Sequence, residues 1–235
     1  MIPLKDDVPS QSTPFVTYGL IALNVVVYLY QFSLSLDARG PGAGAFESFI
    51  LEFGAIPCRI TGACATADQF PHPVATIFSS MFMHGNLLHL LGNMLYLWIF
   101  GDNVEDTLGH GRFLLFYGAS GLAAALGQVL VNPDSRVPMV GASGAVSGVL
   151  GAYLLLFPGA TVLTLMMIGF FYRIIHIPAV IVLGFWIVLQ VVSGYITVAL
   201  GRGESGGVAW FAHIGGFVAG ILLLFLLRPR QSRRI

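Results

Sequence analysis

Polar side chains that could hydrolyse an amide bond stand inside some of the most apolar stretches of the sequence. One stretch carries Ser143 within Gly-Ala-Ser-Gly, and another carries His213 within Ala-His-Ile-Gly-Gly. A serine hydroxyl becomes an effective nucleophile when a base within hydrogen-bond distance takes its proton, and histidine can do this near neutral pH. Ser143 and His213 are therefore the candidate nucleophile and the candidate general base.

Attack on an amide carbonyl creates an oxyanion, and Asn93 and His89 are candidate donors to it. They stand four residues apart, so on a helix they share a face. Removing one fixed donor typically raises the barrier by roughly 3 to 4 kcal/mol. The backbone N–H of Ser143 would be a third donor, because the first turn of a helix leaves its N–H groups without intrahelical acceptors.

The composition predicts that these side chains lie within a membrane. Of 235 residues, 56% are hydrophobic and only 9% are charged, which leaves too little polar surface for a soluble domain of this size. A spanning helix needs roughly 20 mostly apolar residues. Six runs approach that length: 14–34, 77–100, 113–131, 139–157, 177–199 and 208–227. A further run, 161–171, is about half as long, so we expect it to be interfacial or re-entrant.

The sequence therefore predicts an all-α polytopic membrane protein, a six-transmembrane helical bundle with both termini cytoplasmic. The orientation rests on the four arginines of the tail 228–235, because positive charge marks the cytoplasmic face. The expected organisation is a cytoplasmic segment 1–13, a membrane domain 14–227 and a basic cytoplasmic tail 228–235. The first loop, 35–73, would then lie outside.

In this topology the helices 77–100, 139–157 and 208–227 run inward from the outer face, which sets the candidate residues at one shallow depth. Two glycine pairs, Gly144 with Gly148 and Gly216 with Gly220, each form the G-x-x-x-G spacing that lets helix backbones approach closely in lipid. Taken alone such pairs more often serve only packing. Beside a serine and a histidine, they predict that Ser143 meets His213.

Charge and cysteine content limit the possible partners. The formal net charge is +0, which gives no case for nucleic-acid binding. Cys58 and Cys64 could form a disulfide in the external loop, or remain two free thiols. We expect no cofactor and no metal, because the histidines lack carboxylate or thiolate partners within the helices.

These motifs resemble those of the rhomboid family of intramembrane serine proteases, of prokaryotic type, over about residues 73–220. The segment 84–93 is similar to the family's His-x4-His-x3-Asn, 141–144 to its Gly-x-Ser-Gly and 212–216 to its Ala-His-x-Gly/Ala-Gly. The resemblance implies Ser143 as nucleophile, His213 as general base and acid, and no third triad member. It implies that His89, Asn93 and the Ser143 amide form the oxyanion site.

Supporting positions follow from the same resemblance. Gly141 and Gly144 flank the serine, and Glu105, in a segment 101–109 similar to a family loop, would be structural. His84 could be a third donor, a gate residue or merely interfacial, and the last two are favoured. Ser147 stands where some members carry an aromatic that stacks on the base, so the orientation of His213 must be held otherwise.

The resemblance further implies a multi-pass protein of the prokaryotic plasma membrane that cleaves transmembrane segments of other proteins near the outer face, without metal or ATP. The alternative is a non-catalytic rhomboid-like protein that binds membrane helices. Helix 177–199, with Gly184 and Trp186, and the loop 201–207 are candidate gates. Gln128 and Gln190 have no partner that the sequence identifies. The natural substrate and the oligomeric state also stay open.

Overall fold

The computed structural model describes residues 1–36, 44–64, 71–169, 171–200 and 207–229. Parts of the predicted external loop, most of the candidate gate 201–207 and the tail beyond residue 229 lie outside the described residues.

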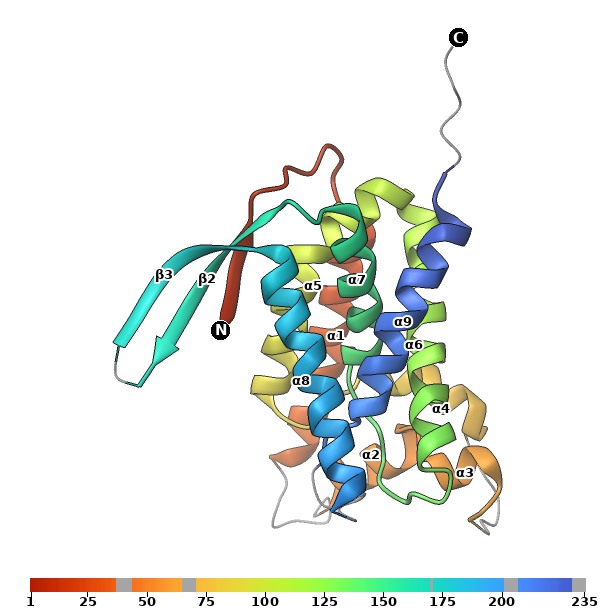
Figure 1. The fold of residues 1–235 in the computed structure, drawn as a ribbon. Helices are drawn as coiled ribbons and strands as arrows, with labels where there is room; N and C mark the ends of the chain where they lie inside the picture. Colours follow the sequence, from red (N-terminus) through yellow and green to blue (C-terminus); the bar gives the residue numbers. More distant parts are fainter. Residues whose placement is uncertain (37–43, 65–70, 170, 201–206, 230–235) are drawn as a thin grey trace.

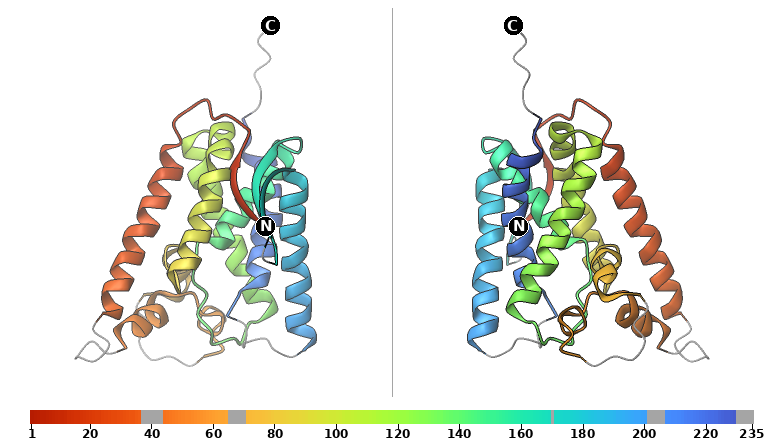
Figure 2. Two further views of the ribbon diagram at one scale, coloured as in Figure 1. Left: turned by 90° about the vertical axis from the view of Figure 1, so that its left-hand side faces the viewer. Right: turned by 90° about the vertical axis from the view of Figure 1, so that its right-hand side faces the viewer.

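The described chain is mostly helical and forms one bundle (Figure 1). Helices α1 and α8 flank the bundle on opposite sides, with α5, α6, α7 and α9 between them (Figure 2). The short helices α2 and α3 lie at the end opposite the C-terminus. The bounds are α1 Phe15–Ser35, α2 Ala45–Phe53, α3 Pro57–Thr61, α4 Pro73–Ser80, α5 Leu87–Leu108, α6 His110–Val131, α7 Ser143–Leu156, α8 Ala179–Ala199 and α9 Trp210–Leu227.

Four helices, α1, α6, α8 and α9, are long and apolar enough to cross a membrane. Helix α7 has the apolar character but only 14 residues, and α5 carries three carboxylates in its last two turns. The chain is thus a multi-pass membrane protein, in which α5 and α7 depart from the length and composition of a simple spanning helix.

The predicted helix 77–100 differs most from the structure. It is divided into α4 and α5 by a turn at residues 81–86, and α5 continues to Leu108. Asn86 is the N-cap of α5, where its Oδ1 accepts a hydrogen bond from the N–H of His89 at 2.9 Å, which favours a helix start at this position. Residues 101–108, expected in a loop, form the end of α5 instead.

The all-α prediction is wrong, because the chain also contains a three-stranded antiparallel sheet. Its strands are β1 Ile2–Asp6, β2 Thr161–Ile168 and β3 Phe171–Pro178, in the order β1-β2-β3. The run 161–171 therefore forms β2 and the start of β3. Ile168 lies opposite Phe171, and Gly169 adopts φ 59° in the turn. A short apolar run does not separate strand from helix by its pattern, and β1 joins from a distant part of the chain.

The β2–β3 hairpin projects from the bundle beside α8, at the end where the C-terminus leaves (Figure 1). Its strand β3 runs through Pro178 directly into α8. Large side chains near the tip are exposed, with Phe171 at 82% and Tyr172 at 77%.

Helix α7 lies at the centre of the bundle, and nine of its 14 residues are buried. It meets α9 through the two predicted glycine pairs. A Cβ added to Gly216 would run into the carbonyl oxygen of Gly144, and one added to Gly220 into that of Gly148. The close approach of these two helices is therefore confirmed, and only glycine permits it at these positions.

The two cysteines form a disulfide that closes a small turn next to α3. Cys58 and Cys64 are joined, with their Cα atoms 5.1 Å apart. Of the two alternatives that the sequence left open, the structure has the disulfide.

Candidate active site

Ser143 and His213 lie within hydrogen-bond distance although they are 70 residues apart. Nε2 of His213 is 2.8 Å from Oγ of Ser143. Ser143 is the first residue of α7, and His213 lies in the first turn of α9. The glycine contacts between these helices allow the two short side chains to meet.

The His213 ring is held on its other side by α8. Its Nδ1 is 2.8 Å from Oε1 of Gln190. The rings of Trp186 and Trp210 flank it, with centroids at 5.9 and 6.3 Å. These contacts orient the ring, although position 147 carries no aromatic side chain. The Ser147 hydroxyl does not bond to the ring and donates instead to the carbonyl of Ser143 at 2.5 Å.

Asn93 and His89 both lie against the backbone that precedes Ser143. A Cβ on Gly141 would be 2.7 Å from Cε1 and Nε2 of His89 and 3.5 Å from Nδ2 of Asn93. Nδ2 of Asn93 is buried and has no hydrogen-bond partner among the described residues, which leaves it available as a donor.

The backbone of Ser143 adds a further donor. The first hydrogen bond of α7 runs from the N–H of Val146 to the carbonyl of Ala142, at 2.9 Å, so the N–H of Ser143 precedes it and lies at the positive end of the helix. The structure therefore brings together every predicted member of the dyad and of the oxyanion site.

His84 is completely buried rather than exposed at an interface. Its ring lies edge-on to that of His89, with centroids 5.1 Å apart. Gln31 of α1 bonds to the backbone of His84 twice. The N–H of His84 donates to Oε1 of Gln31 at 2.9 Å, and Nε2 of Gln31 donates to the carbonyl of His84 at 3.3 Å. The His84 ring thus packs against the ring of His89.

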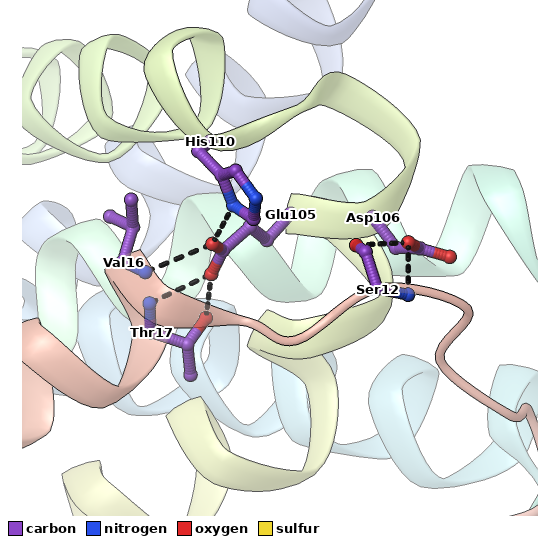
Figure 3. A network of polar contacts seen from close by, with 6 residues as sticks. All are labelled: Ser12, Val16, Thr17, Glu105, Asp106 and His110. Atoms are coloured by element: carbon purple, nitrogen blue, oxygen red, sulfur yellow. Dashed lines mark hydrogen bonds and ion pairs between the residues drawn. The ribbon is translucent and has the colours of Figure 1, made fainter.

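Glu105 joins α5 to the start of α1 (Figure 3). Its carboxylate is fully buried and accepts from the N–H groups of Val16 and Thr17 at 2.9 and 2.7 Å, and from the Thr17 hydroxyl at 2.7 Å. His110 contacts it at 2.6 Å. A carboxylate at a helix N-terminus satisfies the free N–H groups there and interacts favourably with the helix dipole.

A cavity of about 710 Å³ lies between α5 and α8 and includes the paired residues in its wall. Ser143 and His213 share this wall with His89 and Asn93 on one side and Trp186 on the other. The volume suits a ligand the size of a few amino-acid residues. Within the described ranges, no three His, Cys, Asp or Glu side chains cluster as a metal site would require.

Two glutamines gain partners that the sequence did not identify. Gln190 contacts His213, and Oε1 of Gln128 accepts from the N–H of Phe211 at 3.1 Å, which caps the start of α9. The available signal was only that each amide stands within an apolar helix, where a polar side chain normally faces another helix. Gly144 serves packing on α6, because a Cβ there would lie 2.6 Å from Cβ of Ala124.

Known proteins are similar to this chain in sequence over most of its length. A family model described as the rhomboid domain matches residues 71–230. The rhomboid protease AarA of Providencia stuartii is 31% identical over 92% of this chain and 74% of its own length. The putative rhomboid protease YdcA of Bacillus subtilis is 29% identical over 67% of this chain and 69% of its own length.

A plant protein shows the same relationship over a smaller part of its own length. RHOMBOID-like protein 1 of Arabidopsis thaliana is 32% identical over 68% of this chain and 37% of its own length. The two bacterial relatives agree with the prokaryotic type that the motifs resemble. Because the family model covers more than half of the chain, this protein belongs to the rhomboid family of intramembrane proteases.

Proposed function

We propose that the chain is a serine endopeptidase that cleaves peptide bonds in the transmembrane segments of other membrane proteins. The observation that carries this proposal is the distance of 2.8 Å between Oγ of Ser143 and Nε2 of His213, in the wall of a cavity between helices. A nucleophile and a base in hydrogen-bond contact are the minimal machinery of acyl transfer.

In the acylation step, Oγ of Ser143 attacks the carbonyl carbon of the substrate while its proton passes to Nε2 of His213. The carbonyl electrons move onto oxygen, and the resulting oxyanion accepts from Nδ2 of Asn93, the His89 ring and the N–H of Ser143. Donors fixed in advance at this position are usually the largest single contribution to such catalysis.

The intermediate then collapses and the C–N bond breaks. The protonated His213 gives its proton to the leaving amine, which departs and leaves an acyl group on Ser143. A water molecule attacks this ester while His213 takes one of its protons. Return of that proton to Oγ releases the carboxylic acid and restores the enzyme.

The proposed topology has six crossings, those of α5 and α7 included, with both termini cytoplasmic. Helix α7 spans about 21 Å at 1.5 Å per residue, and it begins inside the bundle, where the segment 132–142 leads into it. The start of α6 and the end of α9 lie at the end of the bundle from which the C-terminus leaves (Figure 1). Arg112 is in the first turn of α6 and Arg228 directly follows α9, which supports a cytoplasmic assignment for that end. Cleavage then takes place near the outer face of a prokaryotic cell membrane.

The same topology assigns the segments outside the bundle. Residues 1–13 and 228–235 lie in the cytoplasm, and 35–73 lie outside, where an oxidising environment maintains the Cys58–Cys64 disulfide. The membrane domain extends from residue 14 to residue 227. A non-catalytic role in binding membrane helices is less well supported, because binding alone does not require the Ser143–His213 contact.

The test is cleavage of a single-pass reporter, whose transmembrane segment contains helix-weakening residues, by purified protein in liposomes. Ser143→Ala and His213→Ala should each abolish cleavage, and a chelator should have no effect. Ser147→Ala is the matched control, because this serine lies one turn deeper on α7 and bonds to the backbone. Its activity should stay within about threefold of the wild type. Cleavage that survives Ser143→Ala, or that a chelator stops, would show that the proposed mechanism is wrong.

A further inference from the structure

Gln190 is a buried polar residue on a helix that otherwise contacts the bundle sparsely. Only five of the 21 residues of α8 are buried: Ala179, Val182, Leu183, Gln190 and Gly194. Gln190 is the one polar side chain among them. A polar group in a membrane helix normally has a specific partner, and here the partner of Oε1 is Nδ1 of His213 at 2.8 Å.

The orientation of the Gln190 amide follows from its second hydrogen bond. Nε2 of Gln190 donates to the carbonyl of Trp186, one turn earlier on α8, at 3.2 Å. A carbonyl oxygen only accepts, so the NH2 group must face Trp186. Oε1 therefore faces His213 and can only accept as well.

This orientation determines the tautomer of His213. Because Oε1 accepts, Nδ1 of His213 carries the hydrogen in the neutral ring, and Nε2 carries a lone pair. That lone pair faces Oγ of Ser143 at 2.8 Å. With the opposite tautomer, the Nδ1 lone pair would face the lone pairs of Oε1, and Nε2 could not take the serine proton.

The aromatic neighbours of His213 cannot make this selection. Trp186 and Trp210 restrain the position of the ring, but an indole offers no acceptor in the ring plane for an N–H at Nδ1. Among the described residues, Gln190 is the one side chain that hydrogen-bonds Nδ1.

We infer that Gln190 is a positioning residue, which holds His213 in the tautomer that accepts the Ser143 proton. The position of α8 relative to α9 therefore affects the geometry of the active site. The inference rests on the proposed serine protease function. It goes beyond that function because it assigns a third member to a site predicted to be a dyad. Because Gln190 lies on α8 and contacts Nδ1 of His213, a displacement of α8 would break this contact and lower the basicity of Nε2.

The experiment compares Gln190→Leu, Gln190→Glu and Asn24→Leu in liposomes. Asn24 of α1 is the matched control: it is a fully buried amide whose Nδ2 donates to the carbonyl one turn earlier, at 2.7 Å, and it is not part of the cavity wall. Two quantities are measured, the steady-state kcat and KM for the reporter, and the rate at which a fluorophosphonate labels Ser143.

Gln190→Leu should lower kcat and the labelling rate together, by about 10- to 100-fold, with KM within about twofold of the wild type. Gln190→Glu should recover at least part of this loss, since a carboxylate also accepts from Nδ1. It should also move the acid limb of the pH–rate profile to higher pH, because a carboxylate stabilises the protonated ring. Asn24→Leu should leave kcat and the labelling rate within about twofold.

Three results would overturn the inference. The first is a Gln190→Leu protein with wild-type kcat, and the second is a Gln190→Glu protein that is as slow as Gln190→Leu and shows no change in pH profile. The third is an equal loss in Asn24→Leu. It would mean that the loss in Gln190→Leu comes from removing a buried amide and not from removing the contact with His213. Failure of the proposed function is a separate outcome, because it appears as cleavage by Ser143→Ala whatever residue stands at position 190.

Discussion

Replacement of Gly141 by alanine tests whether the donors of the oxyanion site must lie where the structure has them. An added Cβ would be 2.7 Å from two ring atoms of His89, whereas ordinary contact begins at 3.4 Å. The ring must therefore withdraw by about 0.7 Å, or the backbone before Ser143 must move by a similar distance. Either movement misaligns His89, and Asn93 close to it, with the carbonyl oxygen that the site must stabilise.

The expected result is a fall in kcat of about 100-fold. Loss of one oxyanion donor usually slows the reaction by 10²- to 10³-fold, or about 2.7 to 4 kcal/mol, and misalignment should approach the lower end of this range. KM should change little, because these donors act mainly in the transition state. Gly141 has φ 126°, so alanine also introduces backbone strain of about 1 to 3 kcal/mol.

The assay must separate activity from folding. Reporter cleavage in liposomes gives kcat and KM, and an SDS titration in detergent micelles gives the free energy of unfolding. Gly118→Ala on α6 is the control, because no heavy atom lies within 4 Å of an added Cβ there. A folded Gly141→Ala protein whose kcat is within about threefold of the wild type would refute the assigned geometry.

Three further predictions concern the elements around the site. Glu105→Gln should lower the free energy of unfolding by about 3 kcal/mol, because its NH2 group would face the buried N–H and hydroxyl donors of Thr17. Asp106 accepts only exposed hydrogen bonds from Ser12, so Asp106→Asn should lower the free energy of unfolding by less than about 1 kcal/mol. Equal losses in the two variants would contradict the role of burial. Gly216→Ala should lower kcat by at least about tenfold, since α9 must move away from the Gly144 carbonyl and stretch the Ser143–His213 contact; unchanged cleavage would show that the close approach is not needed. Burial, and secondarily repulsion from Asp102, raise the pKa of Asp6 from 3.8 to about 6. Between these two pH values the folded chain holds a proton that the unfolded chain releases, so the free energy of unfolding falls as the pH rises. Asp6→Asn should flatten this part of the curve of unfolding free energy against pH, and an unchanged curve would exclude Asp6 as its cause.

Local patterns predicted the features that local patterns determine. The apolar run 14–34 became α1 Phe15–Ser35, and 208–227 became α9 Trp210–Leu227, because a stretch this long and apolar has few other stable structures. The glycine pairs predicted that α7 meets α9, because glycines four residues apart lie on one face of a helix and leave that face without side chains. Ser143 and His213 stand on these two helices, and the structure has them in hydrogen-bond contact.

Features that depend on distant partners were missed. Strand β2 pairs with β1, which precedes it by more than 150 residues, and no pattern within residues 161–171 refers to that partner. The break before α5 was missed for a different, local reason: Asn86 is recognised as an N-cap only when the apolar residues after it are taken as the start of a new helix. Gln190 was noted, but its partner depends on how α8 turns toward α9.

A neutral amide behind the general base is consistent with where this site lies. Among the described residues, no Asp, Glu, Lys or Arg side chain lines the cavity around Ser143 and His213, and an isolated charge at this depth would be costly. Charge appears only during the reaction, as an imidazolium and an oxyanion close together, and each then has its hydrogen-bonding groups already in place. A carboxylate at position 190 would stabilise the imidazolium more strongly. While His213 is neutral, however, the carboxylate would be buried without a positively charged partner. Gln190→Glu should therefore fold less stably than the wild type even where it supports catalysis, and the amide gives orientation without that loss.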